Sequence, residues 1–524
     1  MSLALQFTIV GSATLASRIT GFIRDILIAA VLGTGPVADV YVAAFLIPNL
    51  FRKMMSEGAL NAAIVPRLAR LEREGGVQAA RGFSDDLLSL LCVVLIVLVA
   101  VAEFAMPQIM AVLAYGFRVD EAKFADAVLF GRIAFPFVGF ILVVAVMSAV
   151  LNAVERYAIA ALVPLVLNIL MIGVLLALVF ILPGGQRQAG LVLVSTVLVA
   201  GFFQLVILWI SAAREGFDVR PRLGDALMGR VDPSAKTLLL LALPGMVIAG
   251  SGHVQMIVAS QFASLEPRAI SWLYFADRLF QLPVGFVASA VGVVLLPRLA
   301  RAFHQGDGEA MAEAQSESLV FASLLILPAT VALFVLAKPI TAVLFQRGAF
   351  LAEDARATAA LLKVLALALP AFVLIKVILP TFLAREEMRP PLIAVGLGLA
   401  ANIAGAALFR DIERAIAPAA GVAIGVWVNA LVLAFAAQGR MSILPRAWAR
   451  AFAALLAAGV MGFCIGWLAL EAKDWMAAER AFYEKGSVLA LICLAGLAIY
   501  AAAARLLGAF TFRRLRRIGQ KGAE

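Results

Sequence analysis

The pentapeptide PRLAR stands at residues 66–70 and returns unchanged at residues 297–301, which is 231 residues further along the chain. The same offset relates AVL at 111–113 to AVL at 342–344, and a glycine and a phenylalanine follow both copies (AYGF and FQRGAF). A third match pairs Ala153 and Glu155 with Ala384 and Glu386. Short matches are common in a chain rich in alanine and leucine, but three at one offset indicate an internal repeat.

The composition around this repeat is that of a polytopic membrane protein. Of the 524 residues, 64% are hydrophobic and only 15% are charged, and the mean hydropathy is +1.02. Soluble proteins average about 25% charged residues. The net charge of +10 comes from short loops and the C-terminus, which favours membrane topology over nucleic-acid binding as its cause. The three cysteines lie apart in apolar runs, so no disulfide framework or metal site is expected: Cys92, Cys464 and Cys493.

Apolar runs of about 20 residues match the length that crosses a hydrocarbon core of about 30 Å. We place fourteen at 7–32, 38–62, 85–105, 129–152, 158–181, 189–212, 236–262, 270–296, 316–337, 357–383, 390–409, 415–437, 447–469 and 486–508. The first apolar run continues past any small-residue cleavage site, so we expect it to remain as a span. Loops on the side of the termini hold 23 basic residues against 12 on the other side, which predicts that both termini are cytoplasmic.

Spans and repeat together predict the fold class. It is an all-α polytopic membrane protein with about fourteen transmembrane helices, arranged as two parallel six-helix repeats plus two C-terminal helices. The expected domains are an N-terminal six-helix lobe at 1–214, a cytoplasmic linker at 215–235, a C-terminal six-helix lobe at 236–438, two additional helices at 439–508 and a basic cytoplasmic tail at 509–524. Transporters of this construction bind substrate between the halves and expose it alternately to each side.

Eight basic residues fall inside the expected spans, where a central charge costs at least about 2.5–3.5 kcal/mol. They are Arg18, Arg24, Arg52, Lys53, Arg132, Arg278, Lys363 and Lys376. Arg132, Lys363 and Lys376 lie near span ends, so we expect their side chains to extend toward the membrane surface. Lys53 can pair with Glu57 one turn further on, and a structural role and a functional role both stay open for it.

The stretch SRITGFIRD (residues 17–25) puts two arginines inside the first span. Arg18 stands near mid-membrane, about 16 Å along its span at roughly 1.5 Å per residue. Asp25 is seven residues further on and shares nearly the same face, whereas Arg24 points about 120° away. We therefore expect Asp25 to neutralise Arg18, and Arg24 to be the arginine that contacts an anion.

Arg52 and Arg278 add two more guanidinium groups, and in the repeat scheme the first, second and eighth spans border the central interface. Acidic residues at comparable depth are few: Asp25, Asp39, Glu57, Glu103 and Asp277. An excess of arginine predicts an anionic ligand with planar, bidentate acceptors such as phosphate or diphosphate. A purely structural ion-pair network is the alternative.

Helix breakers suggest where the spans bend. The candidates for gates or hinges are Pro48, Asn49, Gly250, Gly252 and Pro283, although membrane helices also tolerate such residues without a functional reason. His253 in the seventh span is more simply a hydrogen-bonded packing residue than a coupling group. We find no phosphate-binding glycine loop, no metal-ligand spacing and no nucleophile elbow, so no cofactor and no enzymatic activity are expected. The pattern favours a secondary carrier.

Three stretches carry a family resemblance. SRITGFIRD (17–25), NLFRKMMSEGALNAAIVPRL (49–68) and SWLYFADRLFQLPVGFVASAVGVVLLPRL (271–299) resemble the MurJ/MviN family of lipid II flippases, in the MOP exporter superfamily. The resemblance covers the whole chain. It implies transport of an undecaprenyl-diphosphate-linked disaccharide-pentapeptide across the bacterial inner membrane for peptidoglycan synthesis. It also implies membrane lipids and cell-wall synthesis proteins as partners, and a lipid-tail groove in the last two helices.

The resemblance implies site residues as well. Cavity arginines of the family match Arg18, Arg24, Arg52 and Arg278, and an acidic position matches Asp39. With Asp25 and Lys53 these form the expected substrate-binding set. Two positions depart from the family: Lys53 replaces a second arginine, and Gln281 replaces a glutamate, which makes the cavity more positive. Asn402 has no aspartate near it in its span, so sodium coupling is not supported.

Two other functions stay open at this point. The same fold could export another polyprenyl-diphosphate-linked saccharide or small cations, although cation exporters should show net acidic cavities. A membrane glycosyltransferase or ligase acting on polyprenyl-phosphate donors would also collect basic residues. Such an enzyme should place essential carboxylates in a sizeable outer loop, and the outer loops expected here are short.

Overall fold

The computed structural model describes residues 3–56, 59–180, 185–305, 307–475 and 480–510, and these residues contain helices and turns but no strand. The chain divides into two compact units. The first consists of Met1–Ser271 with Arg347–Phe350, and the second of Trp272–Gln346 with Leu351–Glu524.

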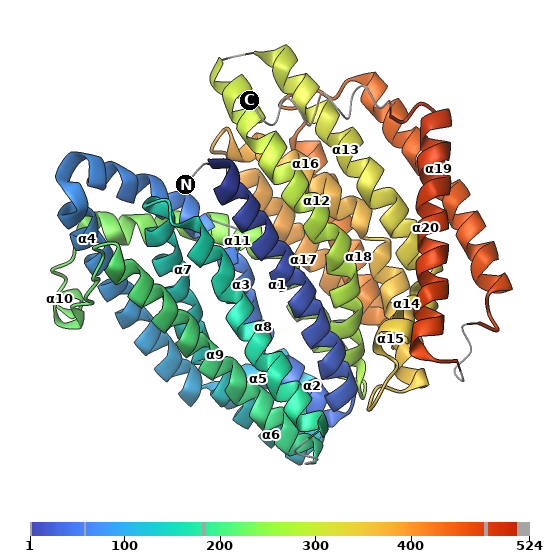
Figure 1. Cartoon of the computed structure of the whole chain (residues 1–524), viewed down its shortest axis with the longest axis horizontal. Helices are drawn as coiled ribbons and strands as arrows, with labels where there is room; N and C mark the ends of the chain where they lie inside the picture. Colours follow the sequence, from blue (N-terminus) through green and yellow to red (C-terminus); the bar gives the residue numbers. More distant parts are fainter. Residues whose placement is uncertain (1–2, 57–58, 181–184, 306, 476–479, 511–524) are drawn as a thin grey trace. The chain divides into compact units, whose positions relative to one another are not determined.

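The first unit is formed by the helices up to α11, with the start of α12. Their bounds are α1 Leu3–Leu32, α2 Pro36–Ala44, α3 Leu46–Ser56, α4 Ala59–Phe104, α5 Met106–Leu113, η1 Tyr115–Val119, α6 Glu121–Ala134, α7 Phe137–Ala153, α8 Tyr157–Phe180, α9 Gln186–Arg214, α10 Leu223–Leu227 and α11 Pro233–Ala263. Helix α1, which contains SRITGFIRD, packs along α8 (Figure 1). This packing places Arg24 of α1 against Asn168 of α8.

The second unit contains most of α12 and all later helices. Their bounds are α12 Ala269–Gln305, α13 Gly308–Val335, α14 Ala337–Phe345, α15 Ala352–Ala366, α16 Leu369–Leu383, α17 Arg389–Arg410, α18 Ala417–Ala436, α19 Pro445–Glu471 and α20 Phe482–Leu506. Helices α13, α19 and α20 lie side by side in this unit (Figure 1). A Cβ on Gly462 would lie 2.4 Å from Val331 Cγ1, and one on Gly496 would lie 2.7 Å from Ile465 Cγ2. Small residues therefore allow the last two helices to pack closely on α13 and on each other.

The all-α membrane fold is confirmed. Within the described residues, ten helical stretches are long and apolar enough to cross a membrane. An eleventh joins Pro233–Ile248 to Gly250–Ala263 across a bend of 59°. The other three expected spans, 7–32, 38–62 and 270–296, coincide with α1, with α2 and α3, and with α12. The count of fourteen is compatible with this arrangement and stays a prediction.

The internal repeat is present in the helix bounds. Shifted by 231 residues, α5 falls on α14, α6 on α15, α7 on α16 and α8 on α17. Helix α4 contains a non-helical residue at Gly76, and its segment after that residue falls on α13. The sequence repeat therefore corresponds to a repeat of structure.

Two repeat-related corners show the same backbone geometry. Glu155 and Glu386, also 231 apart, take left-handed φ values of 58° and 56°. In both corners the next residue donates its N–H five residues back, from Arg156 to the Leu151 carbonyl and from Glu387 to the Phe382 carbonyl. This is the turn that satisfies the last carbonyls of a helix.

The side chains after these corners form ion pairs of opposite polarity. Arg156 Nε lies 2.9 Å from Glu215 Oε1, whereas Glu387 Oε2 lies 2.8 Å from Arg440 Nε. Each pair joins the corner to the end of a following helix, α9 in the first case and the turn after α18 in the second. Both repeats thus have the same turn followed by an ion pair, but the residue after the turn is basic in the first repeat and acidic in the second.

Two features of the fold differ from simple expectations about the seventh and eighth spans. Helix α11 packs against α3, α4 and α5, and it falls in the first unit. Helix α12 runs without a break through Pro283, so the expected interruption there is absent. Neighbouring residues can take over the groups that a proline leaves unbonded in a membrane helix. The lobe and linker boundaries given above stay predictions.

Candidate functional site

Arg24 on α1 is held by a buried carboxylate and a buried amide. Its Nη2 and Nε lie 2.8 and 3.1 Å from Asp25 Oδ1, and its Nη1 donates to Asn168 Oδ1 at 2.9 Å. The Arg24 side chain is 13% exposed and that of Asp25 is 5% exposed. Asn168, on α8, also donates from Nδ2 to the Ser17 carbonyl at 2.9 Å. Partners on two helices therefore fix both the charge and the orientation of this guanidinium.

The pairing of Asp25 corrects the expectation drawn from the helical face. Arg18 and Asp25 share a face, but seven residues separate them by about 10 Å along the axis at roughly 1.5 Å per residue. The long Arg24 side chain instead folds back onto its neighbour. The expectation that Arg24 lacks a local counter-charge is therefore wrong. Arg18 itself is exposed on α1, beside the exposed apolar side chains of Leu15 and Ile19.

Arg52 lies on α3, just after a break in the second expected span. The break falls at Phe45, between α2 and α3, and Pro48 occupies the first turn of α3, where its missing N–H interrupts no helical bond. Arg52 donates from Nε and Nη2 to Asn49 Oδ1 at 3.3 and 3.1 Å. Lys53 beside it is half-buried, and its expected partner Glu57 lies outside the described residues.

Arg278 lies on α12 in the second unit. Its Cζ is 4.4 Å from the centroid of the Tyr274 ring one turn earlier, a cation–π contact. One turn later, Gln281 donates from Nε2 to both carboxylate oxygens of Asp277, at 3.0 and 2.9 Å. Gln281 therefore binds the neighbouring acid, which a carboxylate at this position would repel.

Asp39 on α2 is fully buried, and several donors surround its carboxylate. Lys123 Nζ lies 2.7 Å from Oδ2, and the Arg268 N–H donates to the same oxygen at 3.1 Å. Ser271 donates to Oδ1 from its N–H at 3.0 Å and from its Oγ at 2.7 Å. These bonds join α2 to α6 and to the start of α12. The geometry makes Asp39 a junction between helices, and its contact with a substrate stays a prediction.

The end of α1 contacts the loop Arg347–Phe350. The Ala349 N–H donates to the Ala30 carbonyl at 2.9 Å. Gly33 and Gly348 have φ values of 60° and 56°, and a Cβ on Gly33 would lie 2.3 Å from the Ala349 oxygen. A Cβ on Gly348 would lie 2.3 Å from the Ala30 oxygen. Both glycines are therefore required by left-handed backbone and by close approach.

The end of α11 makes the repeat-related contact. The Gly116 N–H donates to Ser264 Oγ at 2.9 Å, and Gln261 Nε2 donates to the Val112 carbonyl at 3.0 Å. A Cβ on Gly116 would lie 2.1 Å from the backbone carbonyl oxygen of Ser264. Ser264 stands 231 residues after Gly33. The first helix of each repeat, α1 or α11, thus ends against the loop that follows α14 or α5 in the other repeat. Both contacts fall in the first unit.

The glycines of α11 lie beside its bend. The 59° bend falls between Ile248 and Gly250, and Gly252 follows within the same helix. A Cβ on Gly250 would lie 2.7 Å from Met54 Cγ on α3. Glycine at 250 is thus needed for close helix packing, whereas a hinge role for Gly250 and Gly252 stays a prediction.

Chemically, these groups can bind an anion. Guanidinium groups donate to phosphate oxygens in pairs and stay charged at every physiological pH. Among the residues that the structure describes, no group of three or more His, Cys, Asp or Glu side chains could hold a metal ion. Arginines can therefore recognise a phosphate-bearing solute, and binding of such a solute by these residues stays a prediction.

Sequence reasoning missed two hydrogen-bond partners of the expected site residues. Asn168 binds Arg24, and the available signal was an amide inside the otherwise apolar span 158–181. Lys123 binds Asp39, but its position outside the spans grouped it with the loop charges. Neither partner could be assigned without the packing of helices far apart in sequence.

The comparisons with known proteins agree with one another. The family model for lipid II flippase MurJ matches residues 28–483. The probable lipid II flippase MurJ of Rhizobium meliloti (strain 1021) is 38% identical and covers 100% of this chain and 97% of its own length. That of Rhizobium tropici is 38% identical over 99% of this chain and 96% of its own length. The chain belongs to the MurJ family.

Solved structures support the MurJ fold. A lipid II flippase MurJ in an inward closed conformation aligns with a TM-score of 0.74 at 21% identity, covering 94% of this chain and 98% of its own. An inward-facing multidrug resistance MATE family transporter of the MOP superfamily aligns with a TM-score of 0.65 at 17% identity, covering 83% and 97%. At these identities the matches establish the fold alone, which is that of MurJ and its superfamily.

Proposed function

We propose that this chain translocates lipid II, an undecaprenyl-diphosphate-linked peptidoglycan precursor, from the cytoplasmic to the periplasmic leaflet by alternating access. Its family is that of lipid II flippases, which makes it a transporter rather than an enzyme and a multi-pass protein of the inner membrane. The structural observation that carries the proposal is Arg24, a guanidinium fixed by Asp25 and Asn168 inside a membrane helix. An ionisable residue inside a membrane helix is by default a candidate for a ligand site or a pathway, and its partners here hold it in one orientation.

The diphosphate is the part of lipid II that these arginines suit. We assign Arg18, Arg24, Arg52 and Arg278 to its recognition, with Lys53 as a further positive charge. Asp25 orients Arg24, and Asp39 holds the helix junction beside the site. The polyprenyl tail would stay in lipid, along the last two helices, because its transfer through water would expose a large apolar surface.

The excess of basic residues in one set of loops supports cytoplasmic termini. In that orientation α1 and α11 end on the periplasmic side. The contacts of Ala30 with Ala349 and of Gly116 with Ser264 would then close that side and release when it opens. Pro48, Asn49, Gly250, Gly252 and Pro283 are the positions proposed to bend in this change. Cell-wall synthesis proteins, which produce and use lipid II, are the proposed protein partners.

Depletion in the native host tests the function directly. We expect lipid II to accumulate in the inner leaflet and the cells to lyse. Normal arrival of lipid II at the outer leaflet, in cells without a second flippase, would overturn the proposal. Reconstituted vesicles then distinguish between the candidate substrates: lipid II should be translocated, whereas another polyprenyl-diphosphate-linked saccharide should not. The rate of lipid II translocation in the same vesicles, measured under an imposed membrane potential with and without sodium, identifies the energy source that drives transport.

Substitutions test the proposed arginines. Arg18→Ala, Arg24→Ala and Arg278→Ala should each abolish complementation while the protein still inserts in the membrane. Arg132→Ala is the matched control, because this exposed arginine lies near a span end, where its Nε donates to the Glu103 carbonyl. Full function in all three site variants would leave these residues a structural role only.

A further inference from the structure

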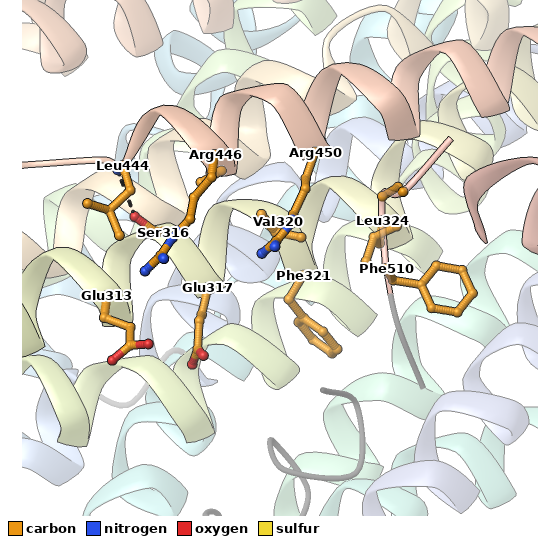
Figure 2. Close-up of a pocket in the computed structure, with 13 residues that line it drawn as sticks. Glu313, Ser316, Glu317, Val320, Phe321, Leu324, Leu444, Arg446, Arg450 and Phe510 are labelled. Carbon is orange, nitrogen blue, oxygen red and sulfur yellow. Dashed lines mark hydrogen bonds between the residues drawn. The ribbon is translucent and has the colours of Figure 1, made fainter. Parts of the chain in front are cut away.

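The second unit contains a pocket apart from the arginines discussed so far. It lies between α13, the start of α19 and the residues after α20, and it opens to the surface, with about 690 Å³ of space when that opening is included. Arg446 and Arg450 extend from α19 toward α13, and Glu313 and Glu317 line the pocket from α13, with their carboxylates directed away from α19 in this view (Figure 2). The pocket therefore contains both signs of charge.

The charged residues form two matched pairs. Arg446 and Arg450 are four residues apart in the first two turns of α19, and Glu313 and Glu317 are four residues apart on α13. Residues at this spacing lie on one face of a helix. Within the described part of the chain, neither Arg446 nor Arg450 forms an ion pair. The start of α19 also has the positive end of a helix dipole, which favours an anion beside these arginines.

The other wall of the pocket is apolar. Phe321 and Leu324 line it from α13 one and two turns beyond the glutamates, and Phe510 lines it from the end of the described chain. On the adjacent surface of α19, Trp448 and Phe452 are 53% and 60% exposed. Exposed aromatic side chains next to basic residues are typical of the head-group level of a membrane. The pocket therefore spans the boundary between head groups and acyl chains.

The junction that forms the pocket is held by hydrogen bonds to the backbone before α19. Ser316 Oγ accepts from the Leu444 N–H at 2.9 Å. Gln315 Oε1 accepts from the Ser442 N–H at 3.1 Å, and its Nε2 donates to Thr381 Oγ1 at 2.9 Å. Because α13 already fixes the chain that leads into α19, the spacing between the two charged pairs is set before any ligand binds.

We propose that this pocket binds a phospholipid whose head group carries both a phosphate and a primary ammonium, as phosphatidylethanolamine does. The phosphate pairs with Arg446 and Arg450, and the ammonium donates a hydrogen bond to Glu313, with the charge of Glu317 one turn further on. One acyl chain lies against Phe321, Leu324 and Phe510. A phosphatidylglycerol head group has no cation for the glutamates, and the quaternary ammonium of phosphatidylcholine has no N–H to donate. The proposal does not depend on the cargo that the protein carries.

The test measures lipid retention by the purified full-length chain. Native mass spectrometry would follow phosphatidylethanolamine, phosphatidylcholine and phosphatidylglycerol added in equal amounts to protein in detergent. We expect phosphatidylethanolamine to be retained in preference to both others. Arg446→Ala with Arg450→Ala, and separately Glu313→Gln with Glu317→Gln, should each weaken its binding about tenfold or more, since charge-assisted hydrogen bonds are lost.

The control substitutes an exposed charged pair elsewhere in the same unit, Arg410→Ala with Glu413→Gln, which should leave retention unchanged. Thermal unfolding in lipid-free detergent shows whether each variant is folded. Equal retention of all three lipids would overturn the proposal, and so would preference for phosphatidylglycerol. Unchanged retention of phosphatidylethanolamine by both pocket variants would also refute it.

Discussion

At the scale of single residues, the arginines inside the membrane are not equivalent. Arg24 is neutralised by Asp25 and oriented by Asn168, whereas Arg18 is exposed on the same helix. A neutralised guanidinium costs less to keep in a membrane and still presents N–H groups to a ligand. The sequence located both residues, but only the packing of α1 on α8 shows this difference.

The role of Asn168 can be tested by its removal. Asn168→Ala deletes the bond to Arg24 and the bond to the Ser17 carbonyl, so we expect a loss of about 1–3 kcal/mol in unfolding free energy and a sharp fall in lipid II translocation. Because Asn168 acts through Arg24, Asn168→Ala should reduce translocation less in an Arg24→Lys background, which lacks the Nη1 that Asn168 binds, than in the unmodified chain. Translocation by reconstituted vesicles measures both effects.

The matched control for this prediction is Asn402→Ala, which removes another buried asparagine, on α17. Asn402→Ala should lower the free energy of unfolding, and its effect on translocation should be the same whether or not Arg24 is substituted. Independent, additive effects of Asn168→Ala and Arg24→Lys on translocation would show that Asn168 does not position the arginine.

At the scale of elements, the start of α11 depends on a capping aspartate. Asp232 Oδ1 accepts from the Ser234 N–H at 2.8 Å, and this backbone bond is the main cause that lowers the pKa of Asp232. Asp232→Ala should cost about 1 kcal/mol of stability at neutral pH, as other N-cap removals do. Thermal unfolding of both proteins in detergent measures the difference.

The pH dependence of this difference has a definite sign. A carboxyl whose pKa is lowered on folding stabilises the protein above its unfolded pKa, near 3.8, and loses that contribution as the pH falls through the folded value. The gap between wild type and Asp232→Ala should therefore narrow below about pH 4. Asp411→Ala, at an exposed position, is the control. A gap that widens in acid would contradict the capping role.

The loop Arg347–Phe350 provides a second prediction for an element. In Gly348→Ala, the new Cβ meets both a left-handed φ and the Ala30 carbonyl. Gly229→Ala is the matched control, because Gly229 has a φ of 69° and nothing within 4 Å of its Cβ position. The left-handed backbone costs about 1–2 kcal/mol in both variants. Gly348→Ala should lose more unfolding free energy than Gly229→Ala, because only its Cβ also meets the Ala30 carbonyl. Equal losses in thermal unfolding would mean that the contact with Ala30 contributes nothing.

At the scale of the whole molecule, the sequence predicted what hydropathy and repetition can determine. The apolar runs and the 231-residue offset gave the helices and the two repeats, and the repeat-related turns at Glu155 and Glu386 confirm that offset in the backbone. The packing of α11 within the first unit could not be predicted, because it depends on contacts with α3 and α4 that leave no local pattern. The same limit applies to the Lys123 and Asn168 partners, which are more than 80 residues from the groups they bind.

Alternating access predicts that the contact between α1 and the loop Arg347–Phe350 must open during transport. The Ala349 N–H donates to the Ala30 carbonyl at 2.9 Å, so the two backbones are in direct contact, and a reversible cross-link between cysteines at these positions tests whether they must separate; formation of the disulfide is verified before transport is measured. We therefore expect Ala30→Cys with Ala349→Cys to stop lipid II translocation when oxidised and to recover it on reduction. The variant is made in a background without Cys92, Cys464 and Cys493, and each single cysteine is a control. Translocation at the normal rate through a fully cross-linked protein would show that this contact stays closed throughout the cycle, and that the path for the head group opens elsewhere.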